Sequence, residues 1–167
     1  RDKLVTGVQT CALPISSHRG TKGTEDVLRA VDRLRNQFKF SFRLISGVPR
    51  AMVIEEMGNS DIVLDQFVLG DYGNVTLEAM ALGKPVLCYL KPYVLNNEPP
   101  DLPIVNATPE TLEAELAVLL ASPSLRAEIG RRSRLYVEKH HDAKSVARDL
   151  FEFYEHLLRE KQGLGKL

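Results

Sequence analysis

The sequence has no excess of charge of either sign. Its 22 lysines and arginines balance 22 aspartates and glutamates, which gives a formal net charge of zero, and the isoelectric point is near 7.1. Proteins that bind nucleic acid or an anionic membrane through their charge carry a basic surplus. The balance therefore predicts no nucleic-acid partner, and it predicts that any contact with a membrane is at most peripheral.

Cysteine is scarce, and long apolar runs are missing. The two cysteines, Cys11 and Cys88, provide neither the spacing of a metal site nor a disulfide framework. No apolar run approaches the length that spans a membrane, and the Gly-x-Gly-x-x-Gly string of nicotinamide-dependent dehydrogenases is absent. These absences favour a soluble, cytoplasmic protein without a bound metal, and they disfavour a dehydrogenase.

Strand-like and helix-like stretches alternate along most of the 167 residues, a length that corresponds to one domain. The predicted strands are residues 40–45, 62–64, 86–90 and 103–105, and the predicted helices begin near residues 24, 50, 74, 108, 122 and 142. This alternation predicts an α/β fold in which a parallel sheet carries helices on both faces. Ligands bind at the carboxyl edge of such sheets, in the loops that follow the strands.

Capping residues and apolar stripes support the predicted helices. Four residues stand where a side-chain cap would accept hydrogen bonds from the first backbone N–H groups: Thr24, Thr108, Ser122 and Asp142. The first helix has a predicted buried stripe of Val27, Leu28, Val31, Leu34 and Phe38. The last helix, residues 142–160, carries apolar residues at the same spacing.

The segment 61–90, with sequence DIVLDQFVLGDYGNVTLEAMALGKPVLCYL, carries the clearest chemical signal. It is predicted to form a strand, a glycine-containing loop, a short helix at residues 74–82 and a second strand. The first N–H groups of a helix lack partners and the helix dipole favours negative charge there, so such a loop provides an anion site. Gly73 allows a ligand to approach the backbone closely, and either Gly73 or Asn74 can cap the helix.

Glu78 stands one turn inside this predicted helix. From there its carboxylate can accept two hydrogen bonds from a vicinal diol, at about the distance that separates a ribose from a phosphate bound at the helix start. A phosphate site followed by a ribose site indicates a nucleotide. The alternative is that Glu78 is an early-helix acid whose only role is to interact with the helix dipole.

The run GDYGNVTLEAMALGKPVL resembles the donor-site segment of the retaining GT-B glycosyltransferases of group 1, or family 4-like type. The pattern of that family is Glu-Gly-Phe-Gly, four residues, and then Glu-Ala-Met-Ala-x-Gly-x-Pro-Val. Gly73 matches the second glycine, Glu78 the second glutamate, and residues 79–86 the tail. The sequence departs from the pattern at Gly70, which stands where the family has its first glutamate.

The resemblance covers residues 16–158 and implies the C-terminal, nucleotide-sugar-binding half of such an enzyme, with a Rossmann-like sheet. It implies sugar transfer from a nucleoside-diphosphate donor with retention of configuration, and neither a metal nor another cofactor. The implied donor-binding residues are Arg19, Lys22, Gly73, Asn74, Val75, Thr76 and Glu78, and the possible donor-sugar contacts are Gly70, Asp71 and Tyr72. The alternative for the loop with Arg19 and Lys22 is a solvated basic turn.

The implied partner of this half is an N-terminal acceptor domain of the same enzyme. The last helix is expected to pack on that domain, which would leave Phe151 or Phe153 exposed in this chain. Two other functions stay open: a nucleotide-sugar epimerase with the same two-domain architecture, and a catalytically silent module that uses the fold for partner contact. Gly70 is the residue that keeps the silent module open, and the base, the sugar and the acceptor lie beyond what a fold determines.

Residues 1–15 are predicted to be an artefactual leader. The string VTGVQTCALPI at residues 5–15 is the translation of a common short-read sequencing adapter, so we interpret it as an assembly artefact and expect the true first strand to be missing or replaced. The alternative is a genuine strand that ends in a polar loop, because Cys11 to Ile15 is apolar. We expect natural sequence from Ser16 onward, with 16–167 as the domain and the whole chain as a fragment.

Overall fold

A five-stranded sheet forms the centre of the computed structural model, which describes residues 9–15 and 22–164. The strands are β1 (Gln9–Ile15), β2 (Phe40–Ser46), β3 (Ile62–Leu64), β4 (Val86–Cys88) and β5 (Val105–Asn106). Their order across the sheet is β2-β1-β3-β4-β5, and every neighbouring pair is parallel. The predicted α/β fold with a parallel sheet is confirmed.

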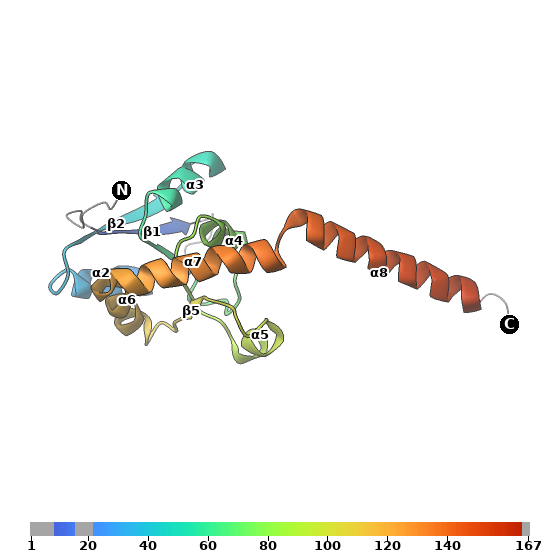
Figure 1. Ribbon diagram of the computed structural model, residues 1–167. Coiled ribbons are helices and arrows are strands. Elements are labelled where there is room, and N and C mark those ends of the chain that lie inside the picture. The colour runs from blue at the N-terminus through green and yellow to red at the C-terminus, as the bar shows by residue number, and fades with distance from the viewer. Residues whose placement is uncertain (1–8, 16–21, 165–167) are drawn as a thin grey trace.

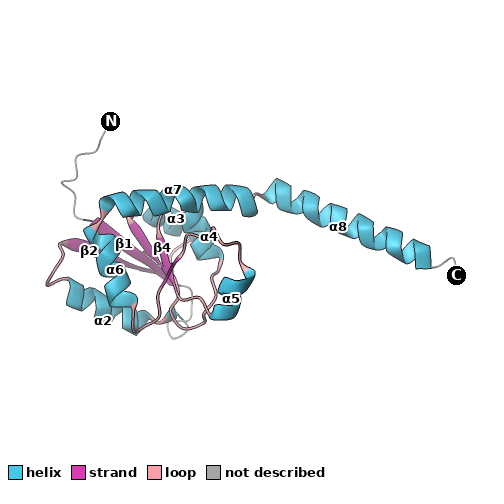
Figure 2. Ribbon diagram, turned by 60° about the horizontal axis from the view of Figure 1, so that its bottom comes forward, coloured by secondary structure: helices cyan, strands magenta, loops and turns pink. Residues whose placement is uncertain are grey.

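Helices cover both faces of this sheet (Figures 1 and 2). They are α2 (Thr24–Leu34), α3 (Arg50–Gly58), α4 (Asn74–Ala81), α5 (Pro92–Asn97), α6 (Leu112–Ala121), α7 (Pro123–His140) and α8 (Ala143–Leu164). Helices α2 and α6 pack on one face, and α3 and α4 pack on the other. Helix α7 runs along α4 and contributes side chains to both layers of the core.

The core consists of two layers that alternate along the short central strands. Ile62 and Leu64 belong to the layer under α2 and α6, whereas Val63 between them belongs to the layer under α3 and α4. All three side chains are fully buried. A strand of a parallel sheet is covered on both faces, so it appears in the sequence as a continuous apolar run instead of an alternating one.

Strand β1 consists of residues that the sequence analysis assigns to the leader. It pairs with β2 along its whole length, and its Cys11 and Ala12 pair with Ile62 and Val63 of β3. Gln9–Ile15 thus fills the position of the first strand, where the sequence analysis expects the true strand to be missing or replaced. The derivation of these residues from a sequencing adapter stays a prediction.

The predicted caps of α7 and α8 are confirmed. Ser122 Oγ accepts a hydrogen bond from the backbone N–H of Leu125 at 3.2 Å, and Asp142 Oδ2 accepts one from Ser145 at 2.9 Å. A side chain that accepts from the third residue of a helix satisfies one of its unpaired donors. These two starts could be predicted because both partners lie within three residues of each other.

The other two predicted helix starts are shifted. Gly23, with a φ of 68°, caps α2 in place of Thr24, which is the first helical residue. Thr108 and Thr111 exchange hydrogen bonds between their hydroxyls and backbone N–H groups at 3.0 and 3.3 Å, so α6 begins only at Leu112. The short polar side chains at this position favour a local turn over an earlier helix.

Three further predictions differ from the structure in detail. Leu28 is 37% exposed and does not belong to the buried stripe of α2. The last strand is Val105–Asn106, later than predicted, and the strand predicted at 86–90 ends at Cys88. Helix α5, which begins with a proline and has six residues, is not predicted from the sequence.

Helix α8 extends away from the rest of the molecule (Figures 1 and 2). Its apolar side chains are between 41 and 63% exposed: Val146, Leu150, Phe151, Phe153, Tyr154, Leu157 and Leu158. The expected exposure of Phe151 and Phe153 is thus confirmed. In the described part of the chain, no helix combines the length and the apolar character needed to cross a membrane.

Gly130 allows α7 to lie directly on the turn between α4 and β4. A Cβ atom on Gly130 would overlap the backbone carbonyl oxygen of Gly83 and lie 3.1 Å from the carbonyl carbon. We expect Gly130→Ala to destabilise the fold by about 1–3 kcal/mol, because overpacking against backbone outweighs the gain of about 1 kcal/mol in helix propensity. Chemical denaturation measures the difference.

Gly58 provides the matched control, since a Cβ atom there would meet nothing within 4 Å. Gly58→Ala should be neutral or stabilise the protein by up to about 1 kcal/mol. Equal effects of the two substitutions would contradict the close packing of α7 on the turn.

Candidate functional site

The candidate site lies where β3 ends and α4 begins, at the carboxyl edge of the sheet. Gly73 caps α4 in an extended conformation with a φ of −126°, and no side chain caps the helix. The first intrahelical hydrogen bond, from Leu77 N–H to the Gly73 carbonyl, is 3.3 Å long. The N–H groups of Asn74, Val75 and Thr76 therefore precede the first bonded turn, as an anion site at a helix start requires.

Glu78 projects from the next turn of α4 and is paired with an arginine. Oε1 of Glu78 accepts hydrogen bonds from Arg50 Nε at 2.8 Å and from Arg50 Nη2 at 2.5 Å. Both contacts go to the same oxygen, so Oε2 has no described contact with Arg50. The Glu78 side chain is 18% exposed, while that of Arg50 is 79% exposed.

A surface pocket of about 550 Å³ surrounds this pair. Its lining residues come from the first turn of α3 and from α4: Arg50, Asn74, Leu77 and Glu78. The predicted phosphate and ribose positions, Asn74 and Glu78, thus face one cavity. Arg50 is absent from the sequence-based site because 28 residues separate it from Glu78. Its one sequence signal is a cation placed directly after a predicted strand and turn.

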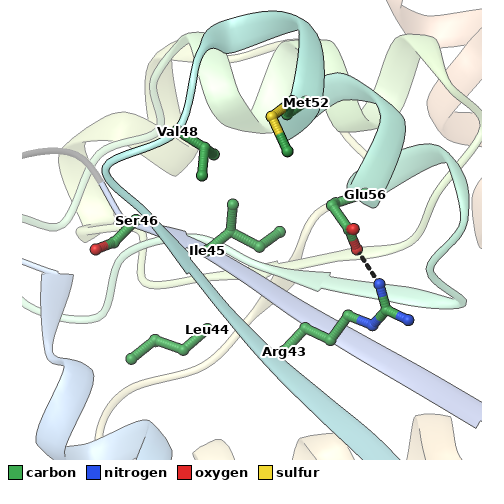
Figure 3. A pocket seen from close by; sticks show the side chains of 7 residues that line it. All are labelled: Arg43, Leu44, Ile45, Ser46, Val48, Met52 and Glu56. Atoms are coloured by element: carbon green, nitrogen blue, oxygen red, sulfur yellow. Dashed lines mark hydrogen bonds and ion pairs between the residues drawn. The ribbon is translucent and has the colours of Figure 1, made fainter.

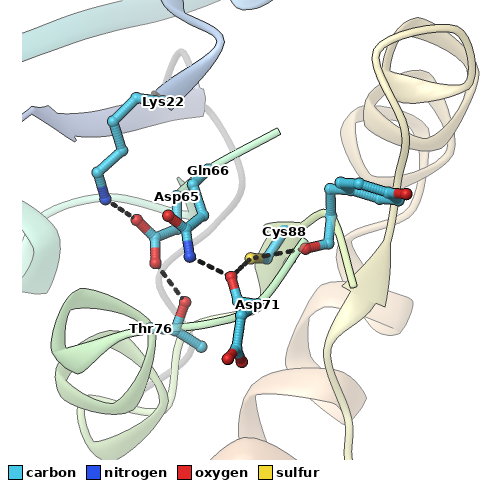
Figure 4. Close-up of polar contacts among 7 residues, drawn as sticks. Lys22, Asp65, Gln66, Asp71, Thr76 and Cys88 are labelled. Carbon is cyan, nitrogen blue, oxygen red and sulfur yellow. Dashed lines mark hydrogen bonds and ion pairs between the residues drawn. The ribbon is translucent and has the colours of Figure 1, made fainter. Parts of the chain in front are cut away.

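Lys22 lies at the same edge but its ammonium is not free. Lys22 Nζ pairs with Oδ1 of Asp65, and Oδ2 of Asp65 accepts a hydrogen bond from the Thr76 hydroxyl at 2.7 Å (Figure 4). Asp65 and Thr76 are fully buried, and the Lys22 side chain is 11% exposed. A buried carboxylate is costly unless it is paired and hydrogen-bonded, so each oxygen of Asp65 has one essential partner.

The alternative of a solvated basic turn therefore does not hold for Lys22, whose ammonium is largely buried and paired with Asp65. Thr76 also contributes its side chain to the interior, not only its N–H group to the helix start. Arg19, the other predicted cation, lies outside the described residues. Asp65 is a residue that sequence analysis missed, because an aspartate after an apolar strand is equally typical of a solvated loop.

The loop between β3 and α4 is held against β4 by hydrogen bonds. Gln66 donates its side-chain amide to the Asp71 carbonyl (Figure 4). The backbone N–H of Tyr89 donates to the Gln66 carbonyl at 2.8 Å. Asp71 Oδ1 accepts from the Tyr72 N–H at 2.7 Å, so this carboxylate oxygen is directed back onto its own loop. Cys88 lies beneath the Asp71 carbonyl, and burial, with the Asp65 carboxylate nearby, raises the pKa of its thiol to about 12.

Tyr72, the predicted aromatic contact, is half-buried and packs on the core layer under α3 and α4. Burial and a hydrogen bond to Glu98 raise the pKa of its phenol to about 12. Glu98 also accepts a hydrogen bond from Tyr136 Oη at 3.0 Å. The Tyr72 hydroxyl is thus bonded toward the protein.

A second pocket and the arrangement of potential metal ligands help to define which residues belong to the site. A second pocket, of about 300 Å³, lies between β2 and α3, where Arg43 pairs with Glu56 at 2.5 Å (Figure 3). It contains none of the predicted site residues. Within the described ranges, no group of three or more histidine, cysteine, aspartate or glutamate side chains is arranged to hold a metal ion.

Comparison with known proteins rests on solved structures, because no protein-family model and no curated protein matches the chain. S. aureus TarM matches 88% of this chain with a TM-score of 0.67 and 13% identity, and sucrose-phosphate synthase of Thermosynechococcus elongatus matches 91% with a TM-score of 0.69 and 14% identity. The C-terminal domain of the glycosyl transferase group 1 protein LpcC of Francisella tularensis matches 81% with a TM-score of 0.59 and 17% identity. The chain has the fold of a GT-B C-terminal domain.

The extent of the match agrees with a single half of the two-domain architecture. The chain spans 36% of TarM and 46% of the sucrose-phosphate synthase, but 87% of the isolated LpcC domain. At identities of 13 to 17% this likeness concerns the GT-B fold and not the activity. The Rossmann-like sheet implied by the sequence resemblance is thereby confirmed.

The buried Lys22 and Asp65 pair gives a stability prediction. Lys22→Met should cost about 3–5 kcal/mol, because it leaves the Asp65 carboxylate buried without a cation. The double variant Lys22→Met/Asp65→Asn should cost at least about 1 kcal/mol less than the sum of the two single variants, since it removes both charges. Denaturant unfolding of the wild type, the two single variants and the double variant gives the four free energies of unfolding from which the coupling energy is calculated.

The exposed pair of Lys139 and Asp101, 3.0 Å apart with side chains 63 and 47% exposed, is the control. The corresponding single and double variants of Lys139 and Asp101 should give a coupling energy of at most about 1 kcal/mol. Additive costs at Lys22 and Asp65 would contradict a buried, interdependent pair.

Proposed function

We propose that this chain binds the nucleoside-diphosphate part of a sugar donor and forms the donor-binding half of a hexosyltransferase-like glycosyltransferase. The observation that carries the proposal is the arrangement of α4. Its N-terminus, where Gly73 provides no side-chain cap, and the carboxylate of Glu78 one turn later face the same 550 Å³ pocket at the carboxyl edge of the sheet. An anion site and a diol acceptor at this spacing suit a phosphate and its ribose.

The pairing of Glu78 with Arg50 is compatible with ribose binding. Arg50 is largely exposed, and such surface ion pairs contribute about 0–1 kcal/mol. Two hydrogen bonds from a diol to a carboxylate contribute about 1.5–3 kcal/mol each. A ribose can therefore use Oε2 beside Arg50 or displace the guanidinium from Oε1 at little cost.

The diphosphate would lie at the first turn of α4, beside Lys22. An ammonium has three donors, so Lys22 can keep its bond to Asp65 and still donate to a phosphate through its exposed part. Arg19 is proposed as a second cation on the resemblance alone. UDP is part of the solved TarM complex, which supports a nucleoside diphosphate as ligand of this fold.

The proposed reaction is transfer of the sugar with retention of configuration, without a metal or another cofactor. Negative charge develops on the departing diphosphate as the glycosidic bond breaks. Fixed N–H groups and cations that already face this position stabilise the charge without reorganisation. In this protein the start of α4, Lys22 and Arg19 would perform that role, which a metal ion performs in other transferases.

The proposed partner is an N-terminal acceptor domain of the same enzyme. The exposed apolar side chains of α8 provide a surface that such a domain would cover. A cytoplasmic location, where nucleotide sugars are available to soluble enzymes, remains a prediction.

Glu78→Ala should weaken binding of the cognate nucleoside diphosphate by at least about tenfold, because it removes two charge-assisted hydrogen bonds. Titration calorimetry across UDP, GDP and ADP with the wild type identifies the base and then measures the loss. The matched control is Glu113→Ala in α6, which removes a glutamate paired with Arg33 at 3.0 Å on the opposite face of the sheet. Unchanged affinity after Glu78→Ala would refute the ribose assignment.

This chain alone should bind donor but not transfer sugar. Positioning of an acceptor against the reacting bond supplies roughly 7–11 kcal/mol of barrier reduction, and it requires the second wall of the cleft. Radiolabelled donor with a broad acceptor panel tests for product, with donor binding confirmed in the same sample. Turnover at ordinary enzymatic rates would overturn the half-enzyme proposal, while failure to bind any nucleotide would favour the silent module.

A further inference from the structure

Lys91 occupies the space in which a side chain on residue 70 would lie. Gly70 has a φ of 79°, and a Cβ atom added to it would overlap Cγ of Lys91 and lie 2.8 Å from both Cδ and Cε. The aliphatic part of Lys91 therefore crosses directly over the Gly70 backbone. A larger residue at position 70 would require both a strained backbone and a displaced lysine.

The backbone around Lys91 is fixed by hydrogen bonds to neighbouring strands and loops. Lys91 N–H donates to the Gly70 carbonyl at 2.9 Å. The side chain of Asn106 binds both backbone groups of Leu90, accepting from its N–H at 2.8 Å and donating to its carbonyl at 3.1 Å. The backbone of Lys91, from which its side chain extends, is thus held at the carboxyl edge of the sheet, one residue before α5.

The position of Lys91 relative to the proposed nucleotide follows from the order of the strands. Arg50 lies on α3, which contacts β1 and α4, whereas Lys91 follows β4, on the other side of β3. In the proposed binding mode the ribose lies at Glu78 and the phosphates lie at the first turn of α4, and we place the sugar beyond Gly73, on the side of β4. The loop at Gly70, with Lys91 across it, lies in that direction.

The charge of Lys91 has no ionic partner among the described residues. Among the residues that the structure describes, none forms an ion pair or a side-chain hydrogen bond with its ammonium, and the residue is partly exposed. Of the acids on the adjoining segments, Asp71 directs one oxygen onto the Tyr72 N–H and Glu98 is bonded by Tyr72 and Tyr136. Lys91 is therefore a cation available to a ligand.

We propose that Lys91 contacts the sugar of the donor and selects a sugar that carries a carboxylate, of the hexuronic acid class. This proposal rests on the proposed donor-binding function. An ammonium forms a charge-assisted hydrogen bond with a carboxylate, which is about twice as strong as a bond to a neutral hydroxyl. A neutral hexose gains less from the same cation, so the difference appears as specificity between donors.

The test uses the full 167-residue chain and three ligands of the cognate base: the nucleoside diphosphate, its neutral hexose derivative and its hexuronate derivative. Calorimetry at low salt should give at least about tenfold tighter binding of the hexuronate than of the hexose. Lys91→Met, which keeps the aliphatic part over Gly70, should abolish this preference and leave the affinity for the nucleoside diphosphate unchanged. Lys91→Arg should retain the preference.

Lys39→Met is the matched control, because Lys39 is exposed and precedes β2, at the opposite edge of the sheet. It should change none of the three affinities. Equal binding of hexose and hexuronate by the wild type overturns the proposal, and so does a Lys91→Met variant that loses nucleoside diphosphate as strongly as hexuronate, since Lys91 would then contact phosphate. Failure of every nucleoside diphosphate to bind overturns the donor-binding function as well, which separates the two proposals.

Discussion

The buried carboxylate of Asp65 is the group on which the geometry of the site edge depends. It ends β3, and its two oxygens bond to Lys22 at the start of the α2 segment and to Thr76 in the first turn of α4. The start of the α2 segment, the end of β3 and the first turn of α4 are thereby held at fixed positions around one carboxylate. Because the low-dielectric surroundings make an unpaired carboxylate so costly, none of the three can move without affecting the other two.

The two ion pairs of this edge have opposite physical characters. The pair between Lys22 and Asp65 is buried, so it fixes structure and yields slowly to a ligand. The pair between Arg50 and Glu78 is exposed on the arginine side, so solvent and ligands compete with it easily. The buried pair of Lys22 and Asp65 keeps the anion site at the start of α4 preorganised. The exposed pair of Arg50 and Glu78 leaves the Glu78 carboxylate accessible as a diol acceptor.

Sequence analysis predicted the local part of this arrangement. The apolar run at 62–64, the cap at Gly73 and the position of Glu78 follow from spacing within one strand-loop-helix-strand unit, and the structure has each of them there. The partners Arg50 and Asp65 were missed because the contacts they make span 28 and 43 residues. No periodicity connects such positions, and only the topology of the sheet brings them together.

Conformational details of the loops were equally inaccessible from sequence. The overlap between Lys91 and position 70 depends on a hydrogen bond between two loops and on a positive φ, neither of which a one-dimensional pattern specifies. The adapter origin of residues 5–15 stays a prediction, because the backbone pairing of Gln9–Ile15 with β2 and β3 does not depend on where the string came from.

The place of β1 within the sheet has a consequence for shortened versions of the chain. Removal of an edge strand breaks the backbone hydrogen bonds to one neighbouring strand. Strand β1 lies between β2 and β3 and pairs with both. A chain cut after Ile15 would therefore divide the sheet and leave β2 and β3 each with a row of unpaired N–H and carbonyl groups facing the gap. Such rows are templates for strands of other chains, so the truncated protein would tend toward intermolecular pairing and aggregation.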